Sequence, residues 1–418
     1  MINVLHILKR NSLFKNGALF AFFSFLNSGM NFLLLLVLAS FFSTSDYGKL
    51  NLVNTFISLL TIFVSLNATG IIAVDFFSKE RQYISRLLST VLCFSTLSFF
   101  IFSLILSICS TWAESWFGFS SVYLWFALLI CYMQVFSTIN LDIWRLEEKP
   151  ISYGLYSSSI VLANFIGTLI LIVAFHSGWV GRLYVQVLFS CLFALLSIVF
   201  LIKRGYLRKV WLNKESVHSV LSFGLPLIPH SASIWVRQGL DRYVINYFYL
   251  ATQVGLYSFA YNFANIIHII GLAFNATNSV FIYKKLANPG LNTVMELRKQ
   301  IKMMSLFFSI ITMLICGGTM IGVPYFFPAY SDALPYLIPL CISAFFQCIY
   351  YLFVNYLFFY KKTRGLMYIT FSFSLLHILL SIIFTRYSVL YTAYITMGIN
   401  ILITTAVFLY SRRIYKII

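Results

Sequence analysis

The hydrophobic pattern divides the chain into long apolar runs separated by short polar loops. About twelve runs are ~20–25 residues long, enough for a helix to cross the ~30 Å hydrocarbon core of a bilayer. They lie at residues 17–42, 50–74, 87–111, 119–143, 151–175, 179–202, 220–248, 252–280, 301–323, 334–359, 365–385 and 388–411. The pattern therefore predicts an all-α, polytopic membrane protein with about twelve transmembrane helices.

Composition agrees, and the distribution of charge predicts an orientation. Hydrophobic residues make up 61% of the chain and charged residues 10%, against about 25% charged in soluble domains. Most of the 29 Lys and Arg residues fall in alternate loops, whereas Lys49, Arg182 and Arg386 fall in the others. Because basic loops stay in the cytoplasm, we expect both termini there. The net charge of +18 thus reflects topology and does not indicate a nucleic-acid partner.

A basic linker and an internal similarity divide the chain into two halves. The linker at 203–219 separates an N-terminal half, 1–202, from a C-terminal half, 220–418. Asp46-Tyr47-Gly48 precedes the second run and Gln253-Val254-Gly255 precedes the eighth, at the same offset that relates Phe56 to Phe263. Transporters with parallel repeats place the substrate between the halves, so we predict two six-helix halves around a central cavity.

The seventh run carries the strongest polar signal. At helical spacing His230, Ser233, Arg237 and Asp241 share one face, and Arg237 and Asp241 are close enough to pair. Each charge at a helix centre costs roughly 2.5–3.5 kcal/mol in a bilayer, so this face should meet water or another helix. We predict that Arg237 faces the cavity. For Arg242 two positions stay open, the cavity and the outer interface.

Polar stripes in neighbouring runs extend this prediction. The first run contributes Asn27 and Asn31, the second contributes Asn54, and the eighth contributes Tyr261, Asn265 and His268. We predict that these stripes line a polar, substrate-binding chamber with the seventh run. The alternative is that they join helices by hydrogen bonds and close packing.

Other features exclude several classes of site. The seven cysteines lie in apolar runs at irregular spacing, which indicates neither a disulfide framework nor a metal site. The chain has no Gly-rich phosphate loop and no long extracytoplasmic loop. We therefore expect no cofactor and no enzyme activity, and the chain reads as a secondary transporter or channel.

Three segments resemble a known family. Gly224-Leu225-Pro226-Leu227, Asp241-Arg242-Tyr243-Val244-Ile245 and Gln253-Val254-Gly255-Leu256-Tyr257-Ser258 resemble the polysaccharide transporter branch of the MOP superfamily, and within it Wzx-type O-antigen flippases. The resemblance implies a MOP-type fold in a bacterial inner membrane. It also implies a flippase in lipopolysaccharide biosynthesis, which moves an undecaprenyl-pyrophosphate-linked O-antigen or other polysaccharide repeat unit from the cytoplasmic to the periplasmic leaflet.

The polar chamber and the family resemblance together predict a transport mechanism, and two alternative functions compete with it. We expect alternating access, with the pyrophosphate held by Arg237. The expected partners are the lipid-linked oligosaccharide and membrane lipids; polysaccharide-assembly proteins and a coupling ion, proton or sodium, remain open. A drug or metabolite antiporter of the same superfamily would carry a carboxylate in its first span, and 17–42 has none. A membrane glycosyltransferase or O-antigen polymerase would need a large outer loop.

Overall fold

The structure is a computed structural model that describes residues 2–77, 79–207 and 212–415. Every regular element in these ranges is helical. Eleven of the described helices are long and apolar enough to cross a membrane. One of them, α8 (Lys214–Ala287), is 74 residues long and covers two predicted spans. The prediction of an all-α polytopic membrane fold is confirmed.

Helix α8 is two helices joined at a reversal. Its backbone leaves the helical region at Leu250, where φ is 70° and ψ is 172°. A positive φ is rare for a residue with a branched side chain. Leu250 falls between the predicted spans 220–248 and 252–280, so the sequence pattern located the interruption. Counting both arms of α8, the described helices can cross a bilayer as the twelve predicted spans.

The chain forms two compact units. The N-terminal unit contains residues 1–42 and 52–232, and the C-terminal unit contains residues 43–51 and 233–418. The boundary between the units falls inside α8, after Ala232. Part of the predicted linker, 208–211, lies outside the described residues.

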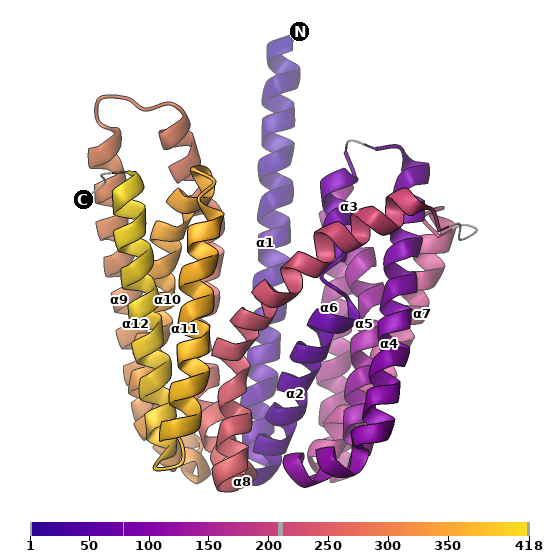
Figure 1. Ribbon diagram of the computed structural model, residues 1–418, viewed down its shortest axis with the longest axis vertical. Helices are drawn as coiled ribbons and strands as arrows, with labels where there is room; N and C mark the ends of the chain where they lie inside the picture. Colours follow the sequence, from indigo (N-terminus) through magenta and orange to yellow (C-terminus); the bar gives the residue numbers. More distant parts are fainter. Residues whose placement is uncertain (1, 78, 208–211, 416–418) are drawn as a thin grey trace. The chain divides into compact units, whose positions relative to one another are not determined.

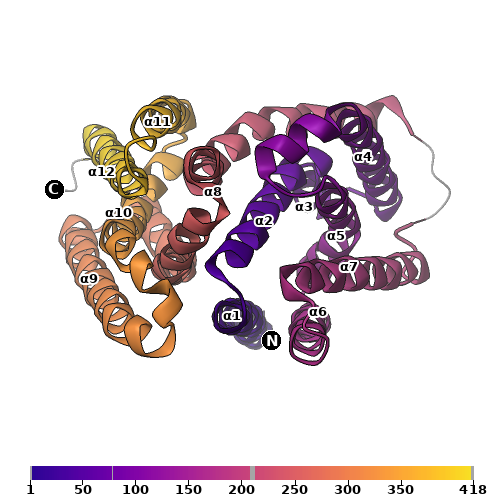
Figure 2. The same cartoon turned by 90° about the horizontal axis from the view of Figure 1, so that it is seen from below.

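The N-terminal unit is a group of long helices with two irregular breaks. Its elements are α1 (Ile2–Phe41), most of α2 (Thr44–Val64), α3 (Thr69–Asp75), α4 (Arg81–Phe117), α5 (Val122–Leu146), α6 (Pro150–Leu169), the π-helix η1 (Ile170–Ala174), α7 (Gly178–Lys203) and the part of α8 up to Ala232. Helix α5 packs against α4 and α7, and α6 packs against α1 and α7 (Figure 2). The predicted span 50–74 is broken because Leu66 and Asn67 adopt positive φ.

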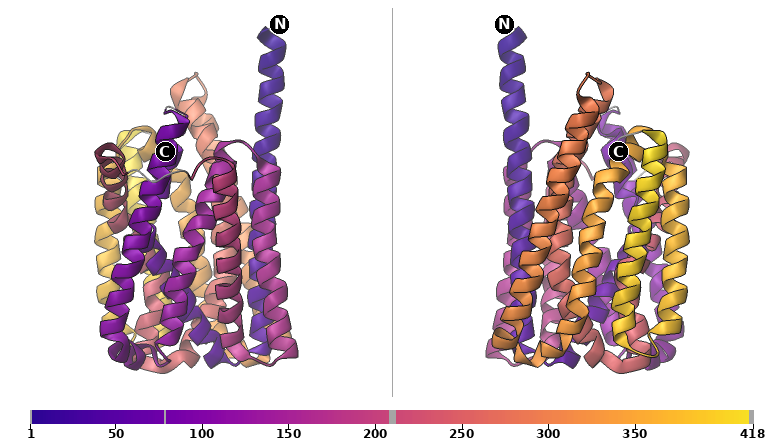
Figure 3. Two further views of the ribbon diagram at one scale, coloured as in Figure 1. Left: turned by 90° about the vertical axis from the view of Figure 1, so that its right-hand side faces the viewer. Right: turned by 90° about the vertical axis from the view of Figure 1, so that its left-hand side faces the viewer.

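The C-terminal unit contains the rest of α8 and the last four long helices. These are α9 (Thr293–Phe326), α10 (Leu334–Phe359), α11 (Thr363–Phe384) and α12 (Val389–Ile414), with the short 3₁₀-helix η2 (Pro328–Ala333) before α10. Helix α12 packs against both α10 and α11, and α9 packs against α10 (Figure 1). The right-hand view of Figure 3 shows these four helices as long, nearly parallel rods.

The two glycines of the internal similarity meet in the C-terminal unit. A Cβ on Gly48 would overlap the carbonyl oxygen of Ala251, and a Cβ on Gly255 would overlap that of Thr44. Thr44 and Ala251 are related by the same offset as Gly48 and Gly255. The contact is therefore reciprocal, and both positions need glycine because a backbone lies where a side chain would begin.

Candidate functional site

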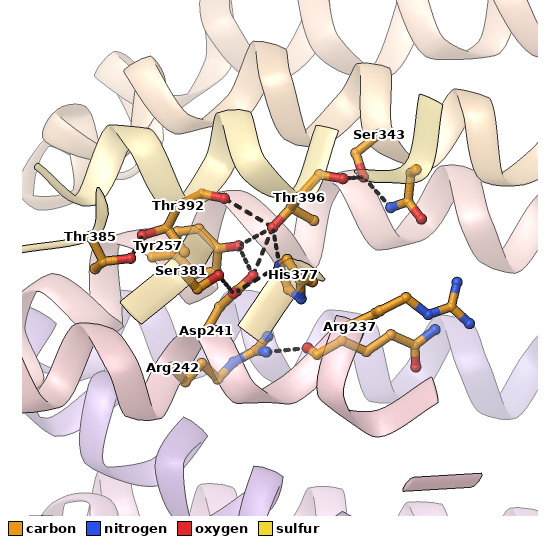
Figure 4. Close-up of polar contacts among 12 residues, drawn as sticks. Arg237, Asp241, Arg242, Tyr257, Ser343, His377, Ser381, Thr385, Thr392 and Thr396 are labelled. Atoms are coloured by element: carbon orange, nitrogen blue, oxygen red, sulfur yellow. Dashed lines mark hydrogen bonds and ion pairs between the residues drawn. The ribbon is translucent and has the colours of Figure 1, made fainter. Parts of the chain in front are cut away.

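Asp241 is the centre of a buried polar cluster in the C-terminal unit (Figure 4). Only 2% of the residue is exposed. Its Oδ2 accepts hydrogen bonds from the hydroxyls of Tyr257 at 2.8 Å and Thr396 at 2.7 Å. Its Oδ1 lies 3.2 Å from Nε2 of His377 and accepts a longer bond, 3.4 Å, from Ser381. The carboxylate, on the first arm of α8, thus has partners from the second arm of α8 and from α11 and α12.

Helical periodicity on α11 explains how this cluster forms. Thr370, Ser374, His377 and Ser381 recur at spacings of four, three and four, and all four are buried. Residues at this spacing share one helix face. Ser374 also donates to the backbone carbonyl of Ser233 at 3.1 Å, which joins this face to the seventh predicted span.

The structure separates the roles of the two arginines beside Asp241. Arg242 is 6% exposed; its Nε donates to the Ser258 hydroxyl at 3.1 Å and its Nη1 to the Gln238 carbonyl at 2.7 Å. Its guanidinium also lies 4.5 Å from the centroid of the Tyr261 ring, a cation–π contact. Arg242 is therefore buried within the unit, but it does not belong to the lining of the pocket described below.

Arg237 does not pair with Asp241 as the sequence suggested. Within the described part of the chain Asp241 instead lies beside His377, whose ring is charged only when it is protonated. Arg237 donates only a long bond, 3.4 Å, to the carbonyl of Ser233, one turn earlier. The spacing on α8 permits the predicted pair, but the carboxylate instead binds groups on α11 and α12. The guanidinium of Arg237 is left with no carboxylate partner among the described residues.

Arg237 instead lines a pocket within the C-terminal unit. The pocket is narrow in this conformation, with a cavity volume of about 20 Å³. The lining comes from α8, α10 and α12 and consists of Arg237, Gln238, Tyr261, Ala264, Asn265, His268, Leu340, Ser343, Ala344, Gln347, Thr396 and Asn400. Arg237 is the only cationic side chain in this lining besides the titratable His268, and no carboxylate belongs to it.

The pocket brings together several predicted residues. His268 is held by hydrogen bonds of 2.7 Å to the Tyr351 hydroxyl and 3.3 Å to Asn265. Asn400 donates to Ser343 at 2.6 Å, and Thr396 connects the pocket lining to the Asp241 cluster. The pocket therefore offers one guanidinium and a set of neutral amide and hydroxyl groups, a combination suited to an anionic group attached to a polar, uncharged one.

The predicted residues of the N-terminal unit have other surroundings. Asn27 donates to Ser157 at 2.9 Å and accepts from Ser158 at 3.0 Å, so it joins α1 to α6. Asn31 is exposed, and Asn54 accepts a 3.4 Å bond from Gln186 on α7. For Asn27 this is the helix-joining role that the sequence left as an alternative.

Two further results concern what the sequence analysis named or missed. His230 lies in α8, but its side chain falls outside the described part of the structure. His377, Thr396 and Asn400, which lie in the last two spans, were not among the residues predicted from the sequence. The four-residue polar periodicity of α11 was the available signal for His377; no local pattern connects Asn400 to the seventh span.

Comparisons with known proteins fit this description. The family model described as "Polysaccharide biosynthesis protein" matches residues 13–281. Lsg locus protein 1 of Haemophilus influenzae is 27% identical over 347 residues, covering 80% of this chain and 81% of that protein. A second membrane protein of the same organism is 26% identical, covering 84% and 85%.

Solved structures show the same fold at low sequence identity. The lipid II flippase MurJ in an inward closed conformation has a TM-score of 0.77 at 15% identity, covering 94% of this chain and 87% of that one. An inward-facing multidrug resistance transporter of the MATE family has a TM-score of 0.74 at 15% identity, covering 94% and 95%. The chain belongs to the polysaccharide biosynthesis protein family and has the fold of MOP-superfamily transporters.

Proposed function

We propose that this protein is a flippase that moves an undecaprenyl-pyrophosphate-linked polysaccharide repeat unit, such as that of an O-antigen, across a bacterial inner membrane. The observation that carries the proposal is the position of Arg237 in a pocket that has no carboxylate in its lining. An intramembrane cation without a counter-charge is costly to keep and marks a site for an anionic ligand.

The chemistry of the pocket supports a diphosphate joined to a sugar. A guanidinium can bind phosphate oxygens through two parallel N–H donors. The amides of Asn265, Gln347 and Asn400 can donate to and accept from sugar hydroxyls. In this conformation the cavity volume is about 20 Å³, below the ~300–1,000 Å³ usual for ligand pockets, so we propose that the pocket widens when the substrate enters during alternating access. We assign the diphosphate and the first sugar to this pocket and leave the polyprenyl chain in the bilayer.

The proposed direction is from the cytoplasmic to the periplasmic leaflet by alternating access. With both termini in the cytoplasm, as the basic loops predict, the membrane potential favours this direction. Moving one negative charge outward is worth about 2.3 kcal/mol per 100 mV of inside-negative potential. The process needs no covalent chemistry and no bound cofactor. Polysaccharide-assembly proteins that supply and consume the repeat unit are the expected partners.

The buried Asp241–His377 pair is our candidate for ion coupling, with a proton as the ion. The 3.2 Å contact between Oδ1 and Nε2 would allow a proton to be shared between the two groups. Thr396 donates a hydrogen bond to Asp241 and also lines the substrate pocket. A change in the protonation of the Asp241–His377 pair would therefore alter the hydrogen bonding of a pocket residue. Sodium is the alternative ion.

Substitution of Arg237 tests the proposed function. In a strain that lacks the protein, a plasmid copy with Arg237→Ala should fail to restore polysaccharide export, whereas Arg237→Lys should restore part of it because a lysine keeps the charge but loses the bidentate geometry. The control is Arg386→Ala, which removes an exposed cation from the same unit. Full export by Arg237→Ala, at normal protein level, would remove Arg237 from the mechanism.

A further inference from the structure

Another buried arginine, Arg182, lies in the N-terminal unit. The sequence places Arg182 beside a loop, where an exposed cation is expected. In the structure Arg182 lies in the second turn of α7 and is only 9% exposed. Its burial is unexpected because a charged side chain near a helix end normally reaches out to the interface.

The contacts of Arg182 are with neutral groups of α6. Its Nη1 donates to the Thr168 hydroxyl at 2.9 Å, to Oδ1 of Asn164 at 3.1 Å and to the Asn164 carbonyl at 3.4 Å. No ion pair with Arg182 occurs in the described part of the chain. The positive charge is therefore solvated by dipoles but not neutralised.

Only one edge of the guanidinium is occupied. All three hydrogen bonds use Nη1. Among the described residues Nε and Nη2 make no hydrogen bond, and neither is among the fully enclosed polar atoms that lack a partner. These two groups form the donor fork that binds two oxygens of a phosphate. A purely structural arginine that held α6 to α7 would need only the occupied edge.

The surroundings point to the same conclusion. The π-helix η1 begins at Ile170, two residues after Thr168, and single π-helical turns are frequent at functional sites. The unneutralised guanidinium thus contacts α6 beside a π-helical turn.

We propose that Arg182 forms an anion-binding site in the N-terminal unit that takes a phosphate-bearing group. This inference rests on the proposed function in taking the diphosphate of the lipid-linked substrate as the ligand. The other source of the same chemistry is the phosphate of an anionic phospholipid headgroup. In the proposed orientation the loop between α6 and α7 is periplasmic, so the site would hold the diphosphate near the periplasmic face.

Binding of a short polyprenyl diphosphate tests this inference. We would purify the full chain in phosphatidylcholine nanodiscs, titrate it with farnesyl diphosphate, and use uncharged farnesol as the control ligand. The Arg237→Gln background silences the site of the C-terminal unit. In that background we expect residual binding that Arg182→Gln weakens about tenfold, a loss of about 1.4 kcal/mol, because glutamine lacks the charge that strengthens the hydrogen bonds to phosphate. Arg182→Lys should recover part of the loss.

Controls distinguish a loss of binding from a loss of folding, and the lipid-linked diphosphate from a phospholipid headgroup as the ligand. Arg386→Gln removes an exposed cation and should leave binding unchanged, and each variant should keep the thermal unfolding midpoint of its parent. Competition by phosphatidylglycerol, added to the nanodiscs, at the Arg182-dependent site would assign it to phospholipid headgroups. Residual binding insensitive to Arg182, or no residual binding in the Arg237→Gln background, would overturn the inference and leave the proposed function standing.

Discussion

At the scale of single residues, the buried charges of α8 differ in the partners that surround them. Asp241 is fully supplied with donors from Tyr257 and Thr396 and pairs with His377. Arg237 has no such partner. Asp241 and Arg237 should therefore have different roles. The carboxylate contributes to the stability of the unit, and the arginine contributes to ligand binding.

Alanine substitution should separate these contributions. We expect Asp241→Ala to lower the stability of the purified protein by about 3–5 kcal/mol, because it leaves the buried His377 and two hydroxyls without their acceptor. The thermal unfolding midpoint in detergent measures the effect. Asp332→Ala removes an exposed carboxylate of the same unit and should change the midpoint little. Equal midpoints for the two variants would contradict the assigned role of Asp241.

A second carboxylate, Glu147, should make the stability of the N-terminal unit depend on pH in the acid range. Glu147, in the loop between α5 and α6, pairs with Arg204 and with Lys149 at 2.9 Å and accepts a 2.6 Å bond from the Tyr206 hydroxyl. Burial alone would raise the pKa of Glu147, but the bonds from Arg204, Tyr206 and Lys149 outweigh it and lower the pKa to about 2.

The sign of the effect follows from linkage. A carboxyl group whose pKa falls on folding stabilises the folded state above its unfolded pKa, and that contribution is lost as the pH falls through the folded pKa. For Glu147 the window runs from about 4.5 to about 2. We expect the unfolding midpoint of the wild type to fall across this window more steeply than that of Glu147→Gln. Parallel pH profiles would mean that the Glu147 carboxylate does not stabilise the fold.

Residue patterns predicted polar pocket residues that lie on α8 but not those that lie on α10 and α12. Arg237, Tyr261, Asn265 and His268 are recognisable because a polar stripe on an apolar helix has few explanations other than a polar partner or cavity. The Arg237–Asp241 pair was wrong for a physical reason. A spacing of four residues shows that two side chains on one helix can meet, but it does not show that a histidine on another helix is a better partner.

At the scale of elements, the apolar runs predicted the helices well. The length of an apolar run predicts a transmembrane helix because an unpaired backbone group in hydrocarbon costs several kcal/mol. Within a single segment, only a helix pairs all of these groups. The exceptions are local backbone events. The break at Leu66 and Asn67 and the π-helix η1 occur inside continuous apolar runs, and hydropathy carries no signal for either.

The reciprocal contact of Gly48 and Gly255 gives a prediction about elements. Gly48→Ala should destabilise the C-terminal unit by about 1–3 kcal/mol, the usual cost of overpacking, because the new methyl group meets the carbonyl of Ala251. Gly255→Ala should have a similar effect through Thr44. Folded yield and unfolding midpoint are the measurements.

A matched control exists in the same unit. A Cβ on Gly318, in α9, would have nothing within 4 Å, so Gly318→Ala should be neutral or slightly stabilising. If Gly48→Ala and Gly318→Ala behaved alike, the close approach of the two backbones would not be a constraint on the fold.

At the scale of the whole molecule, the sequence indicated a family and the comparisons established it. The charge pattern of the loops predicts which way the chain crosses the membrane, and the solved structures show the MOP-superfamily fold. The identity of the cargo comes from neither source. It rests on the chemistry of one pocket with an unneutralised arginine, and for that reason the substrate is the part of the account most in need of a direct test.

The measurement that tests this claim most directly is the leaflet position of the lipid-linked repeat unit. In a strain that lacks the protein but retains the other polysaccharide-assembly functions, complete single repeat units should accumulate on the cytoplasmic leaflet, and restoring the protein should relieve the accumulation. Normal levels on the periplasmic leaflet in the absence of the protein would contradict the flippase account.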